Sequence, residues 1–517
     1  MTDFIKLKID FRSLTDSSDD CSNDKSDDYY LVDDHNVYIK LIKRSHYPAT
    51  FFNNTGDKII FGYGSQDDEL QDEFLAINLS QNRLIIKRDI YGNLPLFYSF
   101  EDSIFTLSND FDWVMENTAS LTPNYRHLLT LMIPNPDIHD CLFEEINLLE
   151  TQSTLMVSNN YLNTFQRAIS LTSPSTDPRD FKKILEESLE NFFSTRISGQ
   201  LAAFEVSGGI DSALLPLYSA GRMPDTSLVA SMIFPGEFGK TQLTKLLEIQ
   251  KFSGLNSLQI PVDINLNPPL SRFNRSTKPF YSYTEIYFEA LDNLAAELEQ
   301  KGIKLISTGL GGDELFESKS DNLDLYSFGE HELSRRNNFK DYPPFVTEKF
   351  KKDYRAGVYL KERYQLPLMP ISLISSQLAR NNIYISRGIW PVSPFINPVL
   401  LAFCNLLPAR FRANKNILKT YYSAKSYPEV IYNPVVNEHF GHFFNDAMQS
   451  QKTKELISNY SKVSAYDEMD LVSLPKLLNY YESLADNPHG NPEYLFNIYG
   501  WLCGEINLQS SKIDSHT

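Results

Sequence analysis

The stretch FEVSGGIDSALL at residues 204–215 joins two apolar segments through two serines, two glycines and an aspartate. Residues 201–206 have the pattern of a buried strand, and the residues after the turn begin a helix. Gly208 and Gly209 permit a tight turn and a close approach of the backbone to a ligand. Successive N–H groups at the start of a helix bind anions. The stretch therefore predicts a phosphate-binding turn at the end of a strand.

The chain around this turn alternates strands with helices. The further elements that we expect are strands at 227–234, 257–263 and 303–308, and helices at 180–197, 241–254 and 283–302. Strands that alternate with helices form a parallel sheet, whose ligands bind at the carboxyl ends of the strands. The sequence therefore predicts an α/β fold with a parallel sheet.

The chain divides into two predicted domains. Residues 1–172 contain short segments of alternating polar and apolar residues with Gly, Asn and Asp between them, which is typical of a β-rich domain. A Pro/Ser/Thr-rich hinge follows, and residues 180–517 form the second domain, mostly helical beyond residue 340. The acidic stretch at 15–28 is interpreted as a solvated loop, and Asp180 as the N-cap of the first helix after the hinge.

Composition narrows the classes of partner. The 517 residues carry a formal net charge of -18, which argues against nucleic acid or an anionic membrane as the main partner. No segment reaches the ~18 apolar residues that a membrane helix needs. The four cysteines are far apart and show no metal-ligand spacing. We therefore expect a cytoplasmic protein with reduced thiols.

A second glycine-rich turn, STGLGGDELF at 307–316, follows the last of the predicted strands. Asp211 and Asp313 would repel a phosphate unless a cation lay between them, so both are interpreted as Mg²⁺ ligands. Either turn alone could be an ordinary turn with a capping aspartate. Two such turns at strand ends favour one shared site for Mg²⁺ and pyrophosphate.

Four segments resemble one family of enzymes. SGGIDS (207–212) resembles the pyrophosphate-binding loop of the N-type ATP pyrophosphatases, and its arrangement with the second turn resembles the asparagine synthetase family. KRDIYGNLPLFYSF (87–100) and GIWPVSPFINPVLLAFCNLLPARFRANKNILK (388–419) are similar to two further segments of that family. The resemblance implies an ATP-pyrophosphatase domain of the adenine nucleotide α-hydrolase type, preceded by a glutaminase-like domain of the Ntn type.

The family's chemistry supplies roles for individual residues. A substrate carboxylate attacks the α-phosphate of ATP, pyrophosphate leaves, and an amine attacks the acyl-adenylate and releases AMP. The resemblance therefore implies ATP as a substrate and Mg²⁺ as a cofactor. The residues that it assigns to ATP and pyrophosphate are Val206, Ser207, Gly208, Gly209, Asp211, Ser212, Met232, Thr308 and Gly309, with Asp211 and Asp313 as catalytic Mg²⁺ ligands.

The first two of three departures from the family pattern narrow the class of substrate that we expect. Thr2 stands where a glutamine-hydrolysing member has its cysteine nucleophile, so the N-terminal domain is interpreted as a degenerate glutaminase. Leu310 stands where asparagine synthetases have a glutamate, and leucine accepts no proton from an amine. β-Lactam synthetases and the cyclases of lasso peptides vary at this place. The two glycines before Asp313 look more like the lasso cyclases.

A third departure concerns a catalytic lysine. Family members usually have a basic residue, a lysine, near the segment that corresponds to 433–440, where this chain has Val435 and Asn437. Lys415, Lys419 and Lys425 are the candidates to replace it, with Lys415 as the first choice. The alternative is that all three lie on a solvated helix face.

Three further groups of residues have both a structural and a functional interpretation. They are His439 and His442 (surface histidines, a metal site or a base), Tyr281, Tyr283 and Tyr287 (core or acceptor pocket) and Glu285 and Glu289 (a solvated pair or the missing base).

The expected function is ATP-dependent amide-bond formation through an acyl-adenylate, releasing AMP and pyrophosphate. The preferred reaction closes an isopeptide ring in a ribosomally made peptide, with a precursor peptide and its processing protease as partners. One alternative is a ligase for a small amino acid substrate, like β-lactam synthetase or asparagine synthetase. Another is a non-catalytic nucleotide-binding carrier or peptide chaperone.

Overall fold

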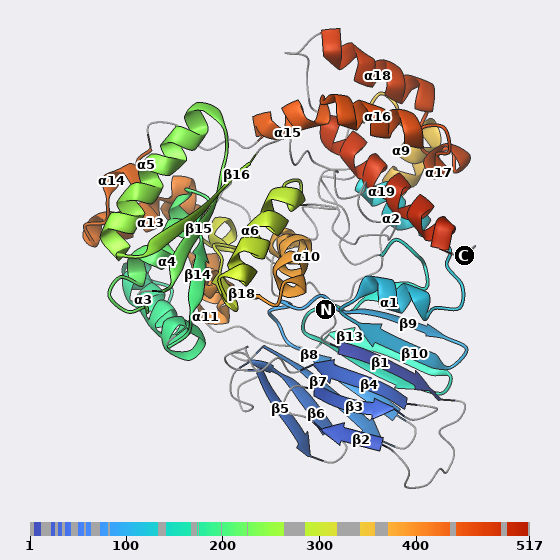
Figure 1. The fold of residues 1–517 in the computed structure, drawn as a ribbon, viewed down its shortest axis with the longest axis horizontal. Helices are drawn as coiled ribbons and strands as arrows, with labels where there is room; N and C mark the ends of the chain where they lie inside the picture. Colours follow the sequence, from blue (N-terminus) through green and yellow to red (C-terminus); the bar gives the residue numbers. More distant parts are fainter. Residues whose placement is uncertain are drawn as a thin grey trace.

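The computed structural model shows antiparallel sheets at the N-terminus and a parallel sheet with helices after them (Figure 1). The residues that the structure describes are 5–11, 22–25, 29–33, 37–42, 50–55, 58–63, 73–80, 83–132, 141–166, 173, 175–197, 199–224, 226–262, 285–317, 342–356, 371–434, 441–486 and 494–514. Across these residues, no helix is both long and apolar enough to cross a membrane.

Two antiparallel sheets make up the N-terminal region. The first has the order β11 (Ile146–Leu148), β9 (Phe97–Glu101), β10 (Ile104–Ser108), β1 (Ile5–Asp10), β4 (Val37–Ile42), β3 (Tyr29–Asp33) and β2 (Ser22–Lys25). The second has the order β13 (Tyr161–Gln166), β12 (Ser153–Ser158), β8 (Arg83–Arg88), β7 (Glu73–Ser80), β6 (Lys58–Tyr63) and β5 (Thr50–Thr55). The predicted β-rich region is confirmed, but the predicted acidic loop is wrong at β2, which lies inside it.

Alternation of side chains explains why these strands form layers. Ile5, Leu7 and Ile9 of β1 are buried, while the residues between them are half-buried. A period of two places alternate side chains on one face of a sheet. These residues share a core cluster with Ile77 of β7 and Ile86 of β8, so apolar faces of both sheets contribute to one core.

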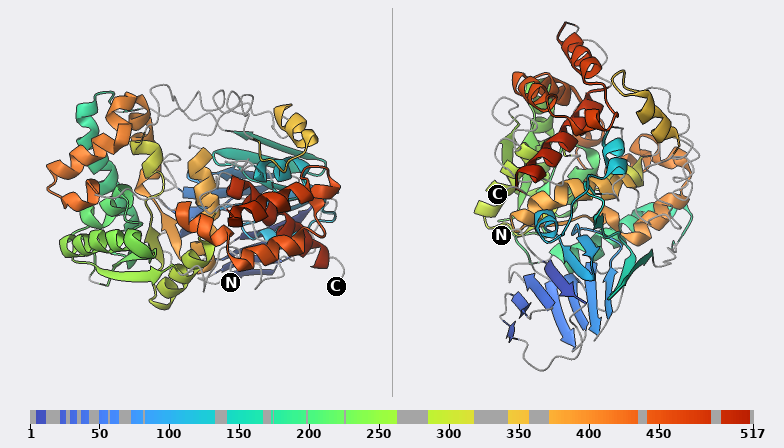
Figure 2. Two further views of the ribbon diagram at one scale, coloured as in Figure 1. Left: turned by 90° about the horizontal axis from the view of Figure 1, so that it is seen from above. Right: turned by 90° about the vertical axis from the view of Figure 1, so that its right-hand side faces the viewer.

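Helices connect the N-terminal region with the end of the chain. Helices α1 (Phe111–Glu116) and α2 (Tyr125–Leu131) are capped by Asp110 and Asn124, whose side chains accept backbone N–H bonds. The long helix α19 (Leu495–Asp514) approaches α2 closely, because a Cβ at Gly500 would lie 1.7 Å from the carbonyl oxygen of Leu131. Figure 2 shows the C-terminal helices beside the N-terminal region.

The second region contains five parallel strands. Their order is β16 (Asn256–Pro261), β15 (Leu228–Ile233), β14 (Ala202–Glu205), β17 (Leu305–Ser307) and β18 (Trp390–Val392), and every neighbouring pair is parallel. The predicted α/β fold with a parallel sheet is therefore confirmed, and the four predicted strands are found within one or two residues of their expected ends. Strand β18 was not predicted.

Helices cover both faces of this sheet. Helices α4 (Ile210–Tyr218) and α5 (Gly236–Ser253) contact β14 and β15, whereas α6 (Phe288–Gln300) and α10 (Ile371–Ser386) contact β15, β16 and β18 (Figure 1). Phe204 and Val229 share a cluster with residues of α4 and α5, whereas Ala203 and Ala230 share a different one with residues of α6 and α10. Adjacent residues of one strand thus point to opposite faces, as the β geometry requires.

The remaining helices surround these layers. They are α3 (Phe181–Phe192), α7 (Gly312–Phe316), α9 (Glu348–Arg355), α11 (Pro398–Leu406), α12 (Ala409–Arg412), α13 (Asn416–Ala424), α14 (Glu429–Tyr432), α15 (Gly441–Met448), α16 (Gln451–Tyr460), α17 (Ala465–Glu468) and α18 (Leu474–Asp486). The predicted cap of α3 is corrected. Asp180 makes no capping bond, because its backbone is already helical in a 3-10 turn (Pro178–Asp180) that Asp177 caps, and its carboxylate accepts from Ser175 Oγ at 2.6 Å.

The sheet reverses its order of growth between β14 and β17. The chain first adds β15 and β16 on one side of β14, then returns to add β17 and β18 on the other side. Ligands of open α/β sheets bind outside the carboxyl ends of the strands at such a reversal. The two glycine-rich turns follow β14 and β17, so both lie at this point.

Candidate active site

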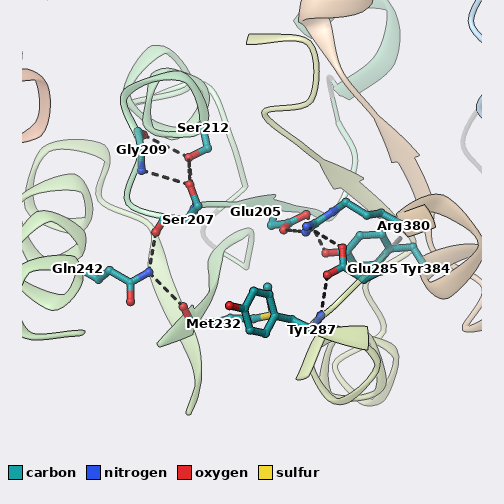
Figure 3. A network of polar contacts seen from close by, with 10 residues as sticks. All are labelled: Glu205, Ser207, Gly209, Ser212, Met232, Gln242, Glu285, Tyr287, Arg380 and Tyr384. Atoms are coloured by element: carbon teal, nitrogen blue, oxygen red, sulfur yellow. Dashed lines mark hydrogen bonds and ion pairs between the residues drawn. The ribbon is translucent and has the colours of Figure 1, made fainter. Parts of the chain in front are cut away.

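The first turn links β14 to α4 and is ordered by its own serines. Gly208 has φ +99°, which a residue with a side chain adopts only with strain. Ser212 Oγ accepts from the N–H of Ser207 at 3.2 Å and lies 3.2 Å from Ser207 Oγ. The N–H of Gly209 donates to Ser207 Oγ at 3.2 Å (Figure 3). The two hydroxyls and the amide hydrogens of the turn thus gather on one side of it.

The second turn packs directly against the first. A Cβ at Gly309 would lie 2.9 Å from the Cα and Cβ atoms of Ser212. A Cβ at Gly312 would lie 2.4 Å from Cβ of Asp211, closer than non-bonded carbon atoms approach. Glycine at both positions therefore allows the ends of β14 and β17 to touch. The sequence prediction that the two turns meet agrees with this geometry.

The two aspartates share one cation. Lys415 Nζ bonds Asp211 Oδ2 and also Asp313 Oδ1, the latter at 2.5 Å. Asn414 and Lys415 both have a left-handed backbone, with φ of 53° and 56°, at the kink before α13. Such a backbone costs energy in residues other than glycine. The kink turns Lys415 toward the two carboxylates.

Burial controls the charges at this position. Burial raises the pKa of Asp211 to about 7, although the Lys415 ammonium opposes this shift. Burial alone would lower the pKa of Lys415, but the two carboxylates raise it above its ordinary value. The side chain of Asp211 is 11% exposed and that of Asp313 is 73% exposed. One aspartate is thus fixed in the protein, and the other faces solvent.

The residues present fit a divalent cation held jointly with a phosphate. Asp211 Oδ1 is buried and has no hydrogen-bond partner in the structure. The described residues contain no group of three or more His, Cys, Asp or Glu side chains that could hold a metal by itself. Mg²⁺ in nucleotide sites is commonly bound by one or two carboxylates together with substrate phosphates and water. Asp211 and Asp313 provide that number of ligands.

Segments from later in the chain support both turns from behind. Ser393, which follows β18, donates from Oγ to the carbonyl oxygen of Leu310 at 2.6 Å. Tyr422 of α13 donates from its hydroxyl to the carbonyl oxygen of Ile210 at 2.5 Å. The segment 388–419, which carries part of the family resemblance, thus contributes the support of the second turn and Lys415.

The other sequence-predicted residues of the nucleotide site lie near the strand ends. Val206 is 1% exposed and packs in the core, whereas Met232 near the end of β15 is half-buried and packs, like Tyr287, against the cluster that contains Phe234. Figure 3 shows both residues. Thr308 is buried, and its N–H donates to the carbonyl oxygen of Val392 in β18 at 2.8 Å. Met232 is therefore the more accessible of the two residues predicted to flank the nucleotide.

A charged network lies on the other face of the same strands. Arg380 of α10 bonds Glu205 and also Glu285, the latter at 3.1 Å, and Tyr384 donates to Glu205 at 2.8 Å (Figure 3). Burial alone would lower the pKa of Arg380, but the two carboxylates raise it above its ordinary value. Glu285 and Glu289 are both 6% exposed, so their interpretation as a solvated pair is wrong.

Several candidates are separated from the two aspartates. Lys425 pairs with Glu186 at 2.5 Å, so it is not the lysine of this site. Among the described residues, the lysine that pairs with Asp211 and Asp313 is Lys415, and not Lys419. Thr2, His439, Tyr281 and Tyr283 lie outside the described residues, as does the side chain of His442.

Four residues around the turns were not found from the sequence: Glu205, Gln242, Lys245 and Arg380. A signal existed for three of them. Glu205 interrupts an apolar strand, and Gln242 and Lys245 lie on the same face of α5 as the buried Leu246 and Ile249. Arg380 gave no such signal, because its partners come from β14 and from the residues before α6.

Comparisons with models of protein families and with curated protein sequences found no match. The resemblance of single segments to the asparagine synthetase family therefore stays a prediction.

Proposed function

We propose that the chain is an ATP-dependent carbon–nitrogen ligase that activates a carboxylate as an acyl-adenylate and joins it to an amine. In this proposal residues 180–517 are an ATP-pyrophosphatase domain, and residues 1–172 a glutaminase-like domain without its nucleophile. The observation that carries the proposal is the pair of turns at the ends of β14 and β17, whose aspartates Asp211 and Asp313 share the ammonium of Lys415.

The first turn would bind the pyrophosphate of ATP. Ser207 and Ser212 offer hydroxyl groups on the side of the turn where the N–H of Gly209 also lies. The N-terminus of α4 adds its partial positive charge to the same place. These groups would stabilise negative charge on the leaving pyrophosphate without having to reorganise during the reaction.

Asp211 and Asp313 would hold Mg²⁺, which when bound neutralises phosphate charge and orients the phosphate oxygens. Lys415 lies between these carboxylates, so its ammonium is close to the charge that develops on the leaving group. A preorganised cation at such a position stabilises the transition state more than the bound substrate. Lys415 would in this way replace the lysine that the family carries further along the chain.

The preferred substrate is a peptide whose side-chain carboxylate and amine are joined into a ring. Leu310 and the two glycines after it support this choice over an asparagine synthetase, whose glutamate is absent here. A glutaminase-like domain with Thr2 in place of cysteine would supply no ammonia, so the amine would come from the substrate. A ligase for a small amino acid substrate is the alternative within the same reaction class.

The test is performed on the purified full chain with Mg²⁺. We expect Mg²⁺-dependent binding of ATP in calorimetry, and exchange of labelled pyrophosphate into ATP when candidate peptides with acidic side chains are supplied. Formation of AMP and a product that is lighter by one water would identify ring closure. A chain that binds no ATP at millimolar concentrations, with or without Mg²⁺, would contradict the proposal.

A further inference from the structure

The first glycine-rich turn is held from behind by two side chains of α5. Gln242 Nε2 donates to the carbonyl oxygen of Ser207 at 2.6 Å and to that of Met232 at 3.4 Å. The N–H of Phe234 donates to Gln242 Oε1 at 3.0 Å. The side-chain amide thus joins the end of β15 to the turn after β14, with bonds from both its oxygen and its nitrogen.

Lys245 holds the next carbonyl group of the same turn. Its Nζ donates to the carbonyl oxygen of Gly208 at 2.9 Å. Gln242 and Lys245 are three residues apart on the inner face of α5, and their side chains are 2% and 1% exposed. Lysine is rarely buried to this extent without a compensating role. Placement of a buried ammonium beneath a predicted anion-binding turn therefore needs an explanation.

The directions of the peptide groups explain why a buried ammonium lies beneath this turn. In a trans peptide the C=O and the following N–H point in opposite directions. Since the carbonyls of Ser207 and Gly208 point to α5, the N–H groups of Gly208 and Gly209 point away from it. The N–H of Gly209 indeed reaches Ser207 Oγ on the far side of the turn. Figure 3 shows Gln242 on one side of Ser207, with Gly209 and Ser212 on the other.

We propose that Gln242 and Lys245 are positioning residues that preorganise the turn for pyrophosphate. They fix the two carbonyl groups against α5, so that the amide hydrogens and both serine hydroxyls face the anion. The ammonium of Lys245 also adds positive charge at close range in a region of low dielectric, where it acts more strongly than in water. This inference rests on the proposed function, because it assigns the turn to the pyrophosphate part of ATP.

The experiment compares three ligands on the full-length Lys245→Met variant, measured by calorimetry at fixed Mg²⁺. Pyrophosphate and ATP should bind roughly tenfold to a hundredfold more weakly than to the wild type, the range for losing one or two charge-assisted hydrogen bonds. AMP, whose phosphate lies outside the turn, should bind within about twofold of the wild-type affinity. A purely structural defect would weaken AMP and ATP alike, and this result would overturn the inference.

A matched control and a second variant complete the test. Lys251→Met removes a lysine from the exposed end of α5, where its side chain is 79% exposed, and should leave all three affinities unchanged. Gln242→Met removes the bonds to Ser207 and Met232, and should also weaken pyrophosphate more than AMP. If the wild type binds pyrophosphate and both variants bind it equally well, only this inference fails. A wild type that binds neither ATP nor pyrophosphate overturns the proposed function together with it.

Discussion

Two turns of this molecule contain the same kinds of residue but arrange them in opposite ways. The turn after β8, which follows Arg88, is closed on itself. Arg88 Nη2 donates to the carbonyl oxygen of Leu94 at 2.7 Å, and Asp89 Oδ1 accepts from the N–H groups of Tyr91 and Gly92 at 2.6 and 2.8 Å. Arg88 Nη2 and the carboxylate of Asp89 are thus bonded by the turn's own backbone.

The serine hydroxyls of the turn after β14 also bond groups of their own turn, but its carbonyls and its aspartate are arranged differently. Its carbonyls are held by α5, its hydroxyls gather on the opposite side, and Asp211 Oδ1 has no partner in the structure. A buried polar group without a partner is costly, so each one needs an explanation, such as a water, an ion or a ligand that bonds it. The two turns thus differ in what their aspartates bond: Asp89 accepts from the backbone of its own turn, whereas Oδ1 of Asp211 has no hydrogen-bond partner among the described residues.

The largest expected difference follows from removing the aspartate of each turn. Asp211→Ala should reduce pyrophosphate exchange at least about 1000-fold, because it removes a cation ligand at the reacting phosphate. Asp89→Ala should leave Mg²⁺-dependent ATP binding intact but lower the free energy of unfolding by about 2–4 kcal/mol, because two buried N–H groups lose their acceptor. Exchange assays and urea unfolding on both variants measure this contrast.

Each variant is controlled by the property that it should leave unchanged, which is stability for Asp211→Ala and ATP binding for Asp89→Ala. Asp211→Ala should unfold near the wild-type urea concentration, and Asp89→Ala should retain its affinity for ATP. If Asp89→Ala lost exchange as completely as Asp211→Ala, the division into a structural and a functional turn would be wrong.

The next largest effect is expected from removing the ammonium group of Lys415, which lies between the two aspartates. Lys415→Met should slow exchange by roughly 100- to 1000-fold, the cost of removing one preorganised group that stabilises transition-state charge. Lys425→Met serves as the matched control, because Lys425 pairs with Glu186 and is expected to change the rate less than about twofold. Equal rates of pyrophosphate exchange in the two variants would contradict a catalytic role and mean that Lys415 only forms a structural ion pair.

Gly312 and Gly92, at which an added Cβ would meet its nearest atom at the same distance, provide a third contrast. A Cβ would lie 2.4 Å from Asp211 Cβ at Gly312, and 2.4 Å from Thr151 Cγ2 at Gly92. Both alanine variants should lower the free energy of unfolding by about 1–3 kcal/mol through overpacking, and Gly92→Ala also through the strain of its left-handed φ of +66°. Only Gly312→Ala should also weaken Mg²⁺-dependent ATP binding, by roughly tenfold, because it separates the two turns at Asp211. Calorimetry and thermal unfolding distinguish them.

Local patterns in the sequence predicted the strands and turns of this site. The apolar segments around β14 and β15 and the glycines at 208, 209 and 254 each carry their signal within a few residues, and the left-handed φ of 75° at Gly254 ends α5 as expected. Strand β18 escaped prediction because it has three residues, of which Pro391 is one. Such a short strand is defined by its neighbour β17 and not by its own pattern.

Most contacts between distant side chains could not be predicted. Lys415 was the first choice among Lys415, Lys419 and Lys425, but no local pattern showed the left-handed backbone at Asn414 and Lys415 that directs it to the aspartates. Glu285 was expected in solvent because its partner Arg380 lies 95 residues further along the chain. Burial of a charge depends on such a partner, which no local pattern contains.

The smallest expected effect tests the link between the two turns. Asn93, at the end of the closed turn, accepts from Gln377 Nε2 at 2.8 Å through its side chain and from Asn381 Nδ2 at 3.1 Å through its carbonyl oxygen. Both partners belong to α10, which also carries Arg380. Asn93→Ala should lower the free energy of unfolding by about 1–2 kcal/mol, because Gln377 loses its acceptor while the backbone bond to Asn381 remains. ATP affinity should stay within about twofold, since α10 packs on the face of the sheet opposite to α4 and α5. A tenfold loss of ATP affinity in isothermal calorimetry would mean that the closed turn acts on the open one through α10, and the two could no longer be treated as independent.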